Sequence, residues 1–188
     1  MVLQTTLVLV RHAHSTYTSD ELGRPLSSKG FSDAVQMSEL LQKESIDVVI
    51  SSPYKRAIQT VEGIAEFFDL DVVIVDGFKE RTLSGQPVED FDVAIRAVWE
   101  NPAFSWNGGE SNLIAQQRGV EATLNVLDLY EGKYIVVGTH GNIMALIMNY
   151  FDEHYDFRFW NTLGMPDAYK LTFENKKLLE VNRLWTEI

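Results

Sequence analysis

The sequence contains no cysteine, and this absence excludes disulfide bonds, thiolate metal sites and a catalytic thiol. It also contains no apolar run near the ~20 residues that a membrane-spanning helix needs. The first ten residues lack a charged leader and a long apolar core, so we expect no secretory signal. These features favour a cytoplasmic protein with no membrane partner.

Basic residues are few relative to acidic ones. Sixteen Lys and Arg stand against 27 Asp and Glu, which gives a formal net charge of −11. Because nucleic-acid-binding proteins usually present a basic face, this balance argues against a nucleic-acid partner. A solvated acidic surface accounts for the surplus carboxylates.

Internal repeats, low-complexity tracts and Pro/Gly-rich linkers are absent as well. The length of 188 residues and the hydrophobic content of 45% fit one globular domain over residues 1–188. Short apolar runs that are typical of strands buried on both faces occur at 7–10, 47–50, 72–75 and 134–137. Residues 169–173 and 178–185 have the pattern of a closing antiparallel pair.

Helical spacing of apolar residues lies between these runs. Apolar residues with this spacing occur after Ser27 and Ser28 and again from about Leu113. They also occur after Ser52 and Pro53, which suit the N-cap and the first turn of a helix. Residues 141–151 are apolar almost all round, which is typical of a buried helix. The alternation predicts an α/β fold, a three-layer α/β/α sandwich with a mostly parallel central sheet.

Residues 76–109 depart from this alternation. They contain one amphipathic helix, around residues 91–98, that is stopped at Asn101 and Pro102. Long connections in compact domains are often lids, so we predict a short lid-like insertion at about 76–109. A helix that merely covers the sheet edge is the alternative. The aromatic residues of this stretch would pack the insertion onto the sheet or line a hydrophobic mouth.

Charged and imidazole side chains follow the predicted strands where each strand ends. They are Arg11 and His12, Arg56 one turn into the next helix, Glu80, and His140. Open parallel sheets bind ligands beyond the carboxyl ends of their strands. We therefore expect these five side chains to converge at one edge of the sheet.

Such a cluster suits phosphoryl transfer, which depends mainly on positioning and on charge stabilisation. Arg11 and Arg56 can grip phosphate oxygens bidentately, as lysine cannot. A neutral His12 can attack phosphorus and form a phosphohistidine. A charged His140 would share the phosphoryl oxygens, and the helix that opens at Gly141 would aim free N–H groups at the same anion.

Glu80 completes this scheme as the proton carrier. Protonated near an apolar loop, it would deliver a proton to the leaving alcohol and later activate water. The scheme needs neither a metal nor a cofactor.

Several segments, in the same order, resemble the histidine phosphatase superfamily, the phosphoglycerate mutase-like proteins. They are residues 9–15 (LVRHAHS), 25–30 (PLSSKG), 51–60 (SSPYKRAIQT), 108–111 (GGES) and 138–141 (GTHG). By this resemblance His12 is the phosphorylated nucleophile, and Arg11, Arg56 and His140 complete the phosphate pocket. Glu80 falls where the family keeps its acid/base carboxylate.

Two residues depart from the family pattern. Ala13 replaces the usual glycine, which is awkward if that position needs a positive φ. Thr18 stands where many members have an asparagine that helps to bind phosphate, so we expect a weakened contact from its hydroxyl.

The resemblance implies a cofactor-independent phosphatase that acts on a small phosphomonoester; it implies nothing about oligomeric state. A phosphoglycerate mutase is the nearest alternative, although such mutases resemble longer chains with a larger insertion. A non-catalytic phosphoester-binding module is a second alternative, which the Ala13 and Thr18 departures favour. A metallohydrolase with His12 and His14 as ligands is a third, but no further ligands are recognisable, and Arg11 would repel a cation.

Overall fold

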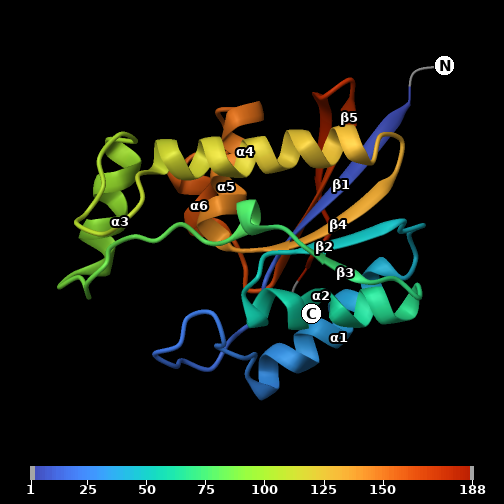
Figure 1. Cartoon of the computed structure of the whole chain (residues 1–188), viewed down its shortest axis with the longest axis horizontal. Coiled ribbons are helices and arrows are strands. Elements are labelled where there is room, and N and C mark those ends of the chain that lie inside the picture. Colours follow the sequence, from blue (N-terminus) through green and yellow to red (C-terminus); the bar gives the residue numbers. More distant parts are fainter. Residues whose placement is uncertain (1–2, 187–188) are drawn as a thin grey trace.

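A six-stranded sheet with helices on both faces forms the centre of the computed structural model, which describes residues 3–186 (Figure 1). The strand order is β3-β2-β4-β1-β5-β6. In chain order the strands are β1 (Gln4–Arg11), β2 (Val48–Ser51), β3 (Val72–Ile74), β4 (Tyr134–Thr139), β5 (Asp167–Glu174) and β6 (Lys177–Arg183). Strands β3, β2, β4 and β1 run parallel to one another. Strand β5 pairs antiparallel with β1 on one side and with β6 on the other. The predicted mostly parallel α/β sheet and its antiparallel closing pair are confirmed.

Two helical layers cover the sheet because β1 alternates its apolar side chains between its faces. Val8 and Val10 pack in the cluster that includes α1 and α2, and Leu7 and Leu9 pack in the cluster that includes α4 and α5. The helices are α1 (Ser28–Leu41), α2 (Lys55–Phe67), α3 (Phe91–Glu100), α4 (Asn112–Leu129), α5 (Gly141–Phe151) and the short α6 (Phe157–Thr162). The sequence analysis did not predict α6.

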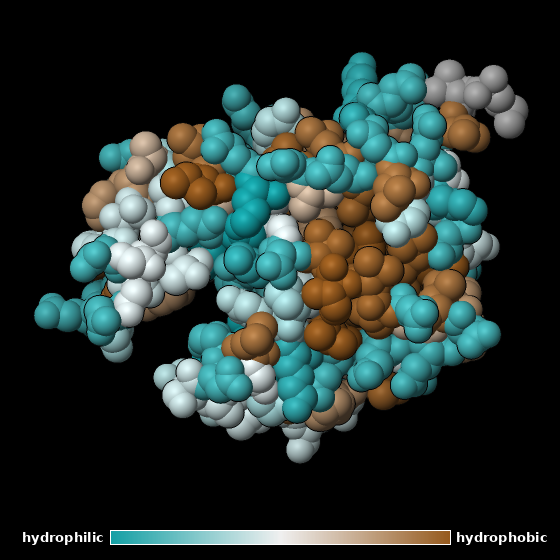
Figure 2. Space-filling model, viewed as in Figure 1, coloured by the Kyte–Doolittle hydropathy of each residue, from teal (hydrophilic) through white to brown (hydrophobic). Residues whose placement is uncertain are grey.

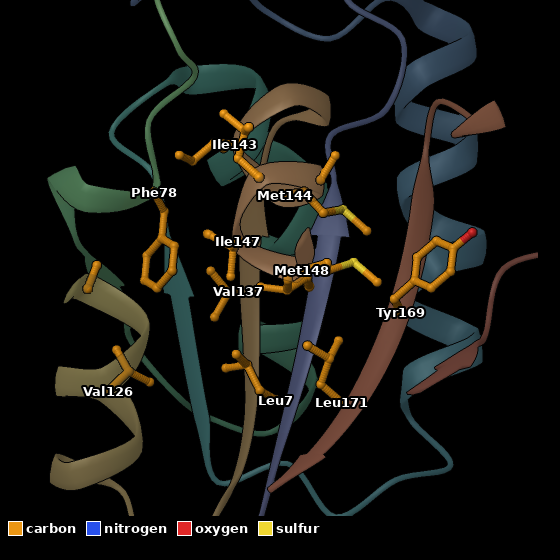
Figure 3. Close-up of a cluster of buried hydrophobic side chains, with 14 of the residues drawn as sticks. Leu7, Phe78, Val126, Val137, Ile143, Met144, Ile147, Met148, Tyr169 and Leu171 are labelled. Atoms are coloured by element: carbon orange, nitrogen blue, oxygen red, sulfur yellow. The ribbon is translucent and has the colours of Figure 1, made fainter. Parts of the chain in front are cut away.

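Helix α5 is the most buried of the helices that position the site. Figure 3 shows its side chains, Met144 and Ile147 among them, packed over Leu7 and Val137 of the sheet. Burying an aliphatic or methionine side chain of this size stabilises a fold by about 1.5–3 kcal/mol. The first turn of α5 is therefore held firmly at the carboxyl end of β4.

The prediction that residues 72–75 form a strand buried on both faces is wrong. Strand β3 lies at the sheet edge, where it pairs only with β2, and Val73 and Ile74 are 40% and 48% exposed. Beside it, an apolar cavity of about 510 Å³ lies between β3 and α4. Figure 2 shows apolar side chains gathered over this region, away from the polar strand ends.

The predicted start of α2 at Ser52 and Pro53 is also wrong. The helix begins at Lys55, and its N-cap residue Tyr54 makes no side-chain cap. The Ser52 hydroxyl lies instead 2.7 Å from Nε2 of His140. A residue that has the pattern of a helix cap therefore belongs to the polar cluster at the strand ends.

Residues 76–109 contain a 3₁₀ turn (Asp76–Phe78) and α3, which lies at the left of Figure 1. As predicted, α3 ends before Asn101, its C-cap. The indole of Trp99 ties the segment to α5, since it donates to Oδ1 of Asn142 at 3.2 Å. The indole of Trp106 makes a hydrogen bond within the segment, to the Ala94 carbonyl at 3.1 Å. None of the helices within residues 3–186 is long and apolar enough to span a membrane.

Candidate active site

The carboxyl ends of β1, β2 and β4 lie side by side, as the sequence analysis expects. The backbone N–H of His12 donates to the Thr139 carbonyl, and that of Ser52 donates to the Gly138 carbonyl, both at 2.9 Å. The sheet ladder thus continues just past the strand ends. It brings the rings of His12 and His140 to a centroid distance of 5.2 Å.

The geometry of His12 leaves one ring nitrogen suited to nucleophilic attack. Its Nδ1 lies 2.7 Å from the Ala13 carbonyl, which only a protonated nitrogen can satisfy. Its Nε2 therefore carries the lone pair and accepts a hydrogen bond from Nε of Arg56 at 3.2 Å. Burial, reinforced by the charges of Arg56 and Arg11 and opposed by the Ala13 hydrogen bond, lowers the pKa of His12 to about 3. The ring is neutral at physiological pH.

His140 is fully buried, and the protein around it disfavours the charged form of its ring. Burial lowers its pKa well below the ordinary value, and the nearby His12 and arginines act in the same direction. Nδ1 of His140 has no hydrogen-bond partner within residues 3–186. The sequence motif identifies the residue, but its charge depends on whether an anion is bound.

Arg11 lies against the first turn of α5. Its Nη1 donates to the carbonyls of Leu163 and Gly164 at 2.8 and 3.0 Å, and its buried Nε lacks a partner among the described residues. A Cβ at Gly141 would come within 2.9 Å of that Nε and 3.0 Å of Cζ. Glycine at 141 therefore makes room for the guanidinium beside the helix terminus.

Arg56 is 4% exposed and uses all three of its nitrogens. Besides the bond to His12, Nη1 donates to the Glu21 carbonyl at 2.8 Å, and Nη2 lies 3.4 Å from the Glu21 carboxylate. That carboxylate also pairs with Arg24. The sequence analysis missed Glu21 and Arg24, which come from the loop between β1 and α1.

Glu80 is bound to the N-terminus of α5. Its Oε2 accepts from the N–H of Asn142 at 3.1 Å, and its Oε1 accepts from those of Ile143 and Arg81 at 3.0 and 2.8 Å. A carboxylate is favoured at this position by the helix dipole. One expectation is therefore corrected: the N–H groups of Asn142 and Ile143 bind Glu80 and not a substrate anion. Both oxygens of Glu80 accept hydrogen bonds from backbone N–H groups.

The backbone before Glu80 is clamped by α4. Nη1 of Arg118 donates to the carbonyls of Gly77 and Lys79 at 2.8 and 3.0 Å. Its other nitrogens bind the two carboxylate oxygens of Glu110 at 2.9 and 2.7 Å. The sequence analysis missed Arg118, because nothing in the local pattern links residue 118 to residues 77–79.

Two other residues of the sequence analysis lie apart from the cluster. The Thr18 hydroxyl donates to the Asp20 carbonyl at 3.0 Å, and it is the Thr18 carbonyl that accepts from Nη2 of Arg24, at 3.3 Å. His14 is exposed, with Nδ1 2.8 Å from the Ser27 hydroxyl. Within residues 3–186 no three His, Cys, Asp or Glu side chains gather as a metal site.

Ala13 fits its position without backbone strain. It does not have a positive φ, and its N–H donates to the Thr60 hydroxyl at 3.0 Å. The methyl group that replaces the family's glycine is fully buried. This departure from the family pattern therefore leaves the local geometry intact.

A cavity of about 530 Å³ opens beside these residues. Arg56, Glu80 and Arg81 line it, together with the loop after β1 and part of the segment before α3. Figure 2 shows the surface hollowed here, at the left of the molecule, between that loop and the α3 region. A small anionic molecule can enter from this side.

The sequence pattern of the Histidine phosphatase superfamily (branch 1) matches residues 7–180. The chain belongs to this family. The resemblance drawn from the motifs is thereby confirmed.

Individual relatives carry phosphatase names. The chain is 33% identical over 94 residues to the uncharacterized phosphatase PhoE of Bacillus subtilis. This matched stretch covers 46% of this chain and 49% of PhoE. The chain is 30% identical over 159 residues to the metal-independent phosphoserine phosphatase of Arabidopsis thaliana, covering 76% and 67%. The match thus spans about half of the first relative's length and two thirds of the second's.

Solved structures share the fold. A mycobacterial glucosyl-3-phosphoglycerate phosphatase superposes with a TM-score of 0.78 at 20% identity, over 97% of this chain and 98% of that one. At this identity the likeness establishes the fold alone.

Proposed function

We propose that this protein hydrolyses a small phosphomonoester through a phosphohistidine formed on His12. The observation that carries the proposal is the state of His12: a buried, neutral ring whose Nε2 lone pair faces a guanidinium at 3.2 Å. A neutral imidazole is a nucleophile, and an adjacent arginine can bind the group that it attacks.

In the first step Nε2 of His12 attacks phosphorus, and the bond to the ester oxygen breaks. Arg56 turns from His12 to the non-bridging oxygens, which Arg11 and His140 also bind. The leaving alcohol takes a proton from Glu80, which must first be protonated and give up at least one of its three backbone hydrogen bonds. In the second step Glu80 takes a proton from water, the water oxygen attacks phosphorus, and His12 and phosphate are released.

The family relationship supports hydrolysis without a metal or other cofactor. The names of both relatives described above contain the word phosphatase, one of them as metal-independent, and the structural neighbour is also named as a phosphatase. We further propose that residues 76–109 act as a lid over a small-molecule site, with Thr18 at most a weak phosphate contact. We also propose that the protein acts in the cytoplasm and has no nucleic-acid partner.

Rapid quench with a phosphate-labelled ester tests the proposal. We expect an acid-labile, base-stable phosphoryl group on the wild-type protein, none on His12→Ala, and wild-type labelling of His14→Ala, the exposed neighbour. Labelling and turnover should survive treatment with EDTA. Label found on Ser52 would refute the phosphohistidine, and label delivered to a second alcohol in preference to water would indicate a mutase.

A further inference from the structure

We propose that Ser52 is a positioning residue for the reaction at His12: its hydroxyl holds His140 in the tautomer that offers a hydrogen on Nδ1 to a phosphoryl oxygen. This inference rests on the proposed function, because it concerns how His140 binds the group that His12 attacks. It gives a role in the site to a serine whose sequence context has only the pattern of a helix cap.

The backbone fixes Ser52 beside His140. Strands β2 and β4 pair in parallel with Ser51 opposite Gly138, and the N–H of Ser52 donates to the Gly138 carbonyl at 2.9 Å. Pro53 follows Ser52, and a residue before proline is disfavoured in the helical conformation. Ser52 therefore continues past β2 without entering α2, and its fully buried hydroxyl lies 2.7 Å from Nε2 of His140.

The Ser52 hydroxyl is the donor in this contact. Its oxygen accepts from the N–H of Tyr54 at 3.3 Å, and within residues 3–186 its hydrogen has no acceptor other than Nε2 of His140. A buried hydroxyl hydrogen without an acceptor is unfavourable, so the Nε2 lone pair takes it. Burial keeps the ring neutral by lowering its pKa. Because a neutral imidazole carries one N–H, the hydrogen of His140 lies on Nδ1.

The other contacts of the His140 ring do not select a tautomer. The rings of Tyr54 and His12 lie edge-on to it, with centroid distances of 4.8 and 5.2 Å. Such contacts fix the plane of a ring, whereas the nitrogen that carries the proton is set by the hydrogen bond at the other nitrogen. Ser52 makes the only hydrogen bond to this ring among the described residues, so the tautomer depends on it.

Nδ1 of His140 is then a buried donor that needs an acceptor. It makes no hydrogen bond in the part of the chain that the structure describes, and neither does Nε of Arg11, which lies against the first turn of α5. The oxygens of a phosphoryl group at His12 can supply acceptors to both. In the opposite tautomer Nδ1 would present a lone pair to the anion. Ser52 thus allows a neutral His140 to donate without first taking up a proton.

Nitrogen-15 NMR of the four histidine rings tests the tautomer directly. In the wild-type protein without phosphate we expect a hydrogen on Nδ1 of His140 and none on Nε2, with the signals assigned from their loss in His140→Asn. Ser52→Ala should lose this preference. Ser51→Ala is the matched control, because the buried Ser51 hydroxyl donates to the Ser52 carbonyl and not to a ring.

Two outcomes of this experiment would overturn the proposal. One is a hydrogen on Nε2 of His140 in the wild-type protein, and the other is the same tautomer in wild type and in Ser52→Ala. The first outcome needs no variant at position 52, so the proposal stays testable even if Ser52→Ala fails to fold.

Phosphate binding measures what the tautomer does. In calorimetric titration Ser52→Ala should bind inorganic phosphate about 10–10²-fold more weakly than wild type, as expected for the loss of one hydrogen bond to a charged group. Ser52→Thr, which keeps a hydroxyl, should recover the wild-type tautomer and most of this affinity, and Ser51→Ala should bind phosphate as wild type does. A lowered melting temperature of Ser52→Ala with wild-type phosphate affinity would show that Ser52 is only structural.

Failure of the reaction and failure of the positioning role are distinguishable. If rapid quench found no phosphohistidine on wild type, the proposed function would fail, whereas the tautomer and the phosphate affinity would still be measured without turnover. If wild type is labelled on His12, labelling of Ser52→Ala should be slowed by a factor similar to its loss of phosphate affinity. Labelling of Ser52→Ala at the wild-type rate would overturn the role of Ser52 and leave the phosphohistidine in place.

Discussion

The two buried histidines should make the folded protein sensitive to mild acid. In the unfolded chain a histidine has a pKa of about 6.5, whereas burial lowers the pKa of His12 to about 3 and shifts His140 in the same direction. Between about pH 3 and pH 6.5 His12 therefore binds a proton in the unfolded chain but not in the folded protein. The free energy of unfolding therefore falls as the pH is lowered from about 6.5 toward 3, and it recovers as the pH rises.

The size of the effect follows from the shift. One histidine that stays neutral in the fold loses about 2 kcal/mol of stability between pH 7 and pH 5. His140 adds to this loss, because burial shifts its pKa in the same direction. Since domains of this kind are stable by roughly 5–15 kcal/mol, the loss is large enough to measure.

Urea unfolding at pH 5 and pH 7 tests this reasoning. His12→Asn should lose about 2 kcal/mol less than wild type over that range, because its side chain does not titrate. His154→Asn is the control: its exposed ring has a pKa raised by Asp152, so its removal should change the pH dependence in the opposite direction. Equal pH dependence of wild type and His12→Asn would show that His12 titrates normally, and the argument for a neutral nucleophile would fail.

Two further substitutions test the groups around His12. Arg56→Ala should slow the reaction by about 10²–10³-fold, as expected for the loss of a preorganised charge partner, and Arg56→Lys should recover little because it lacks the bidentate fork; a near-wild-type rate for Arg56→Ala would place that side chain outside the reaction. Glu80→Gln should slow phosphorylation by alkyl phosphates by about 10²–10⁴-fold, but slow the burst with p-nitrophenyl phosphate much less, because nitrophenolate leaves without a proton. Equal losses on both esters would mean that Glu80 only shapes the site.

The convergence of the site could be predicted from the sequence because local patterns determine it. Apolar runs mark the strands, and a parallel sheet brings the residues after those runs to one edge. This reasoning placed His12 and His140 correctly, and it predicted α5 with the bounds Gly141–Phe151.

The contacts that depend on residues distant in the chain could not be predicted. Ser52 and His140 are 88 positions apart, and Arg118 and Gly77 are 41 apart. Ser52 has the pattern of a helix cap, and Arg118 that of an ordinary helix-surface arginine. Only the packing of α4 and α5 on the sheet brings these side chains to the strand ends. The charge of His140 cannot be predicted from the motif either, because the protonation of its ring depends on what else is buried beside it.

The hydrogen bonds of Glu80 suggest how one carboxylate can serve as acid and then as base. Glu80 binds the first turn of α5, next to His140 at the helix N-cap. In the proposed reaction the leaving alcohol takes its proton from Glu80, and at least one of the hydrogen bonds between Glu80 and the helix must open for this transfer. Once the alcohol has left, Glu80 is again a carboxylate held by backbone N–H groups, which is the form that takes a proton from water.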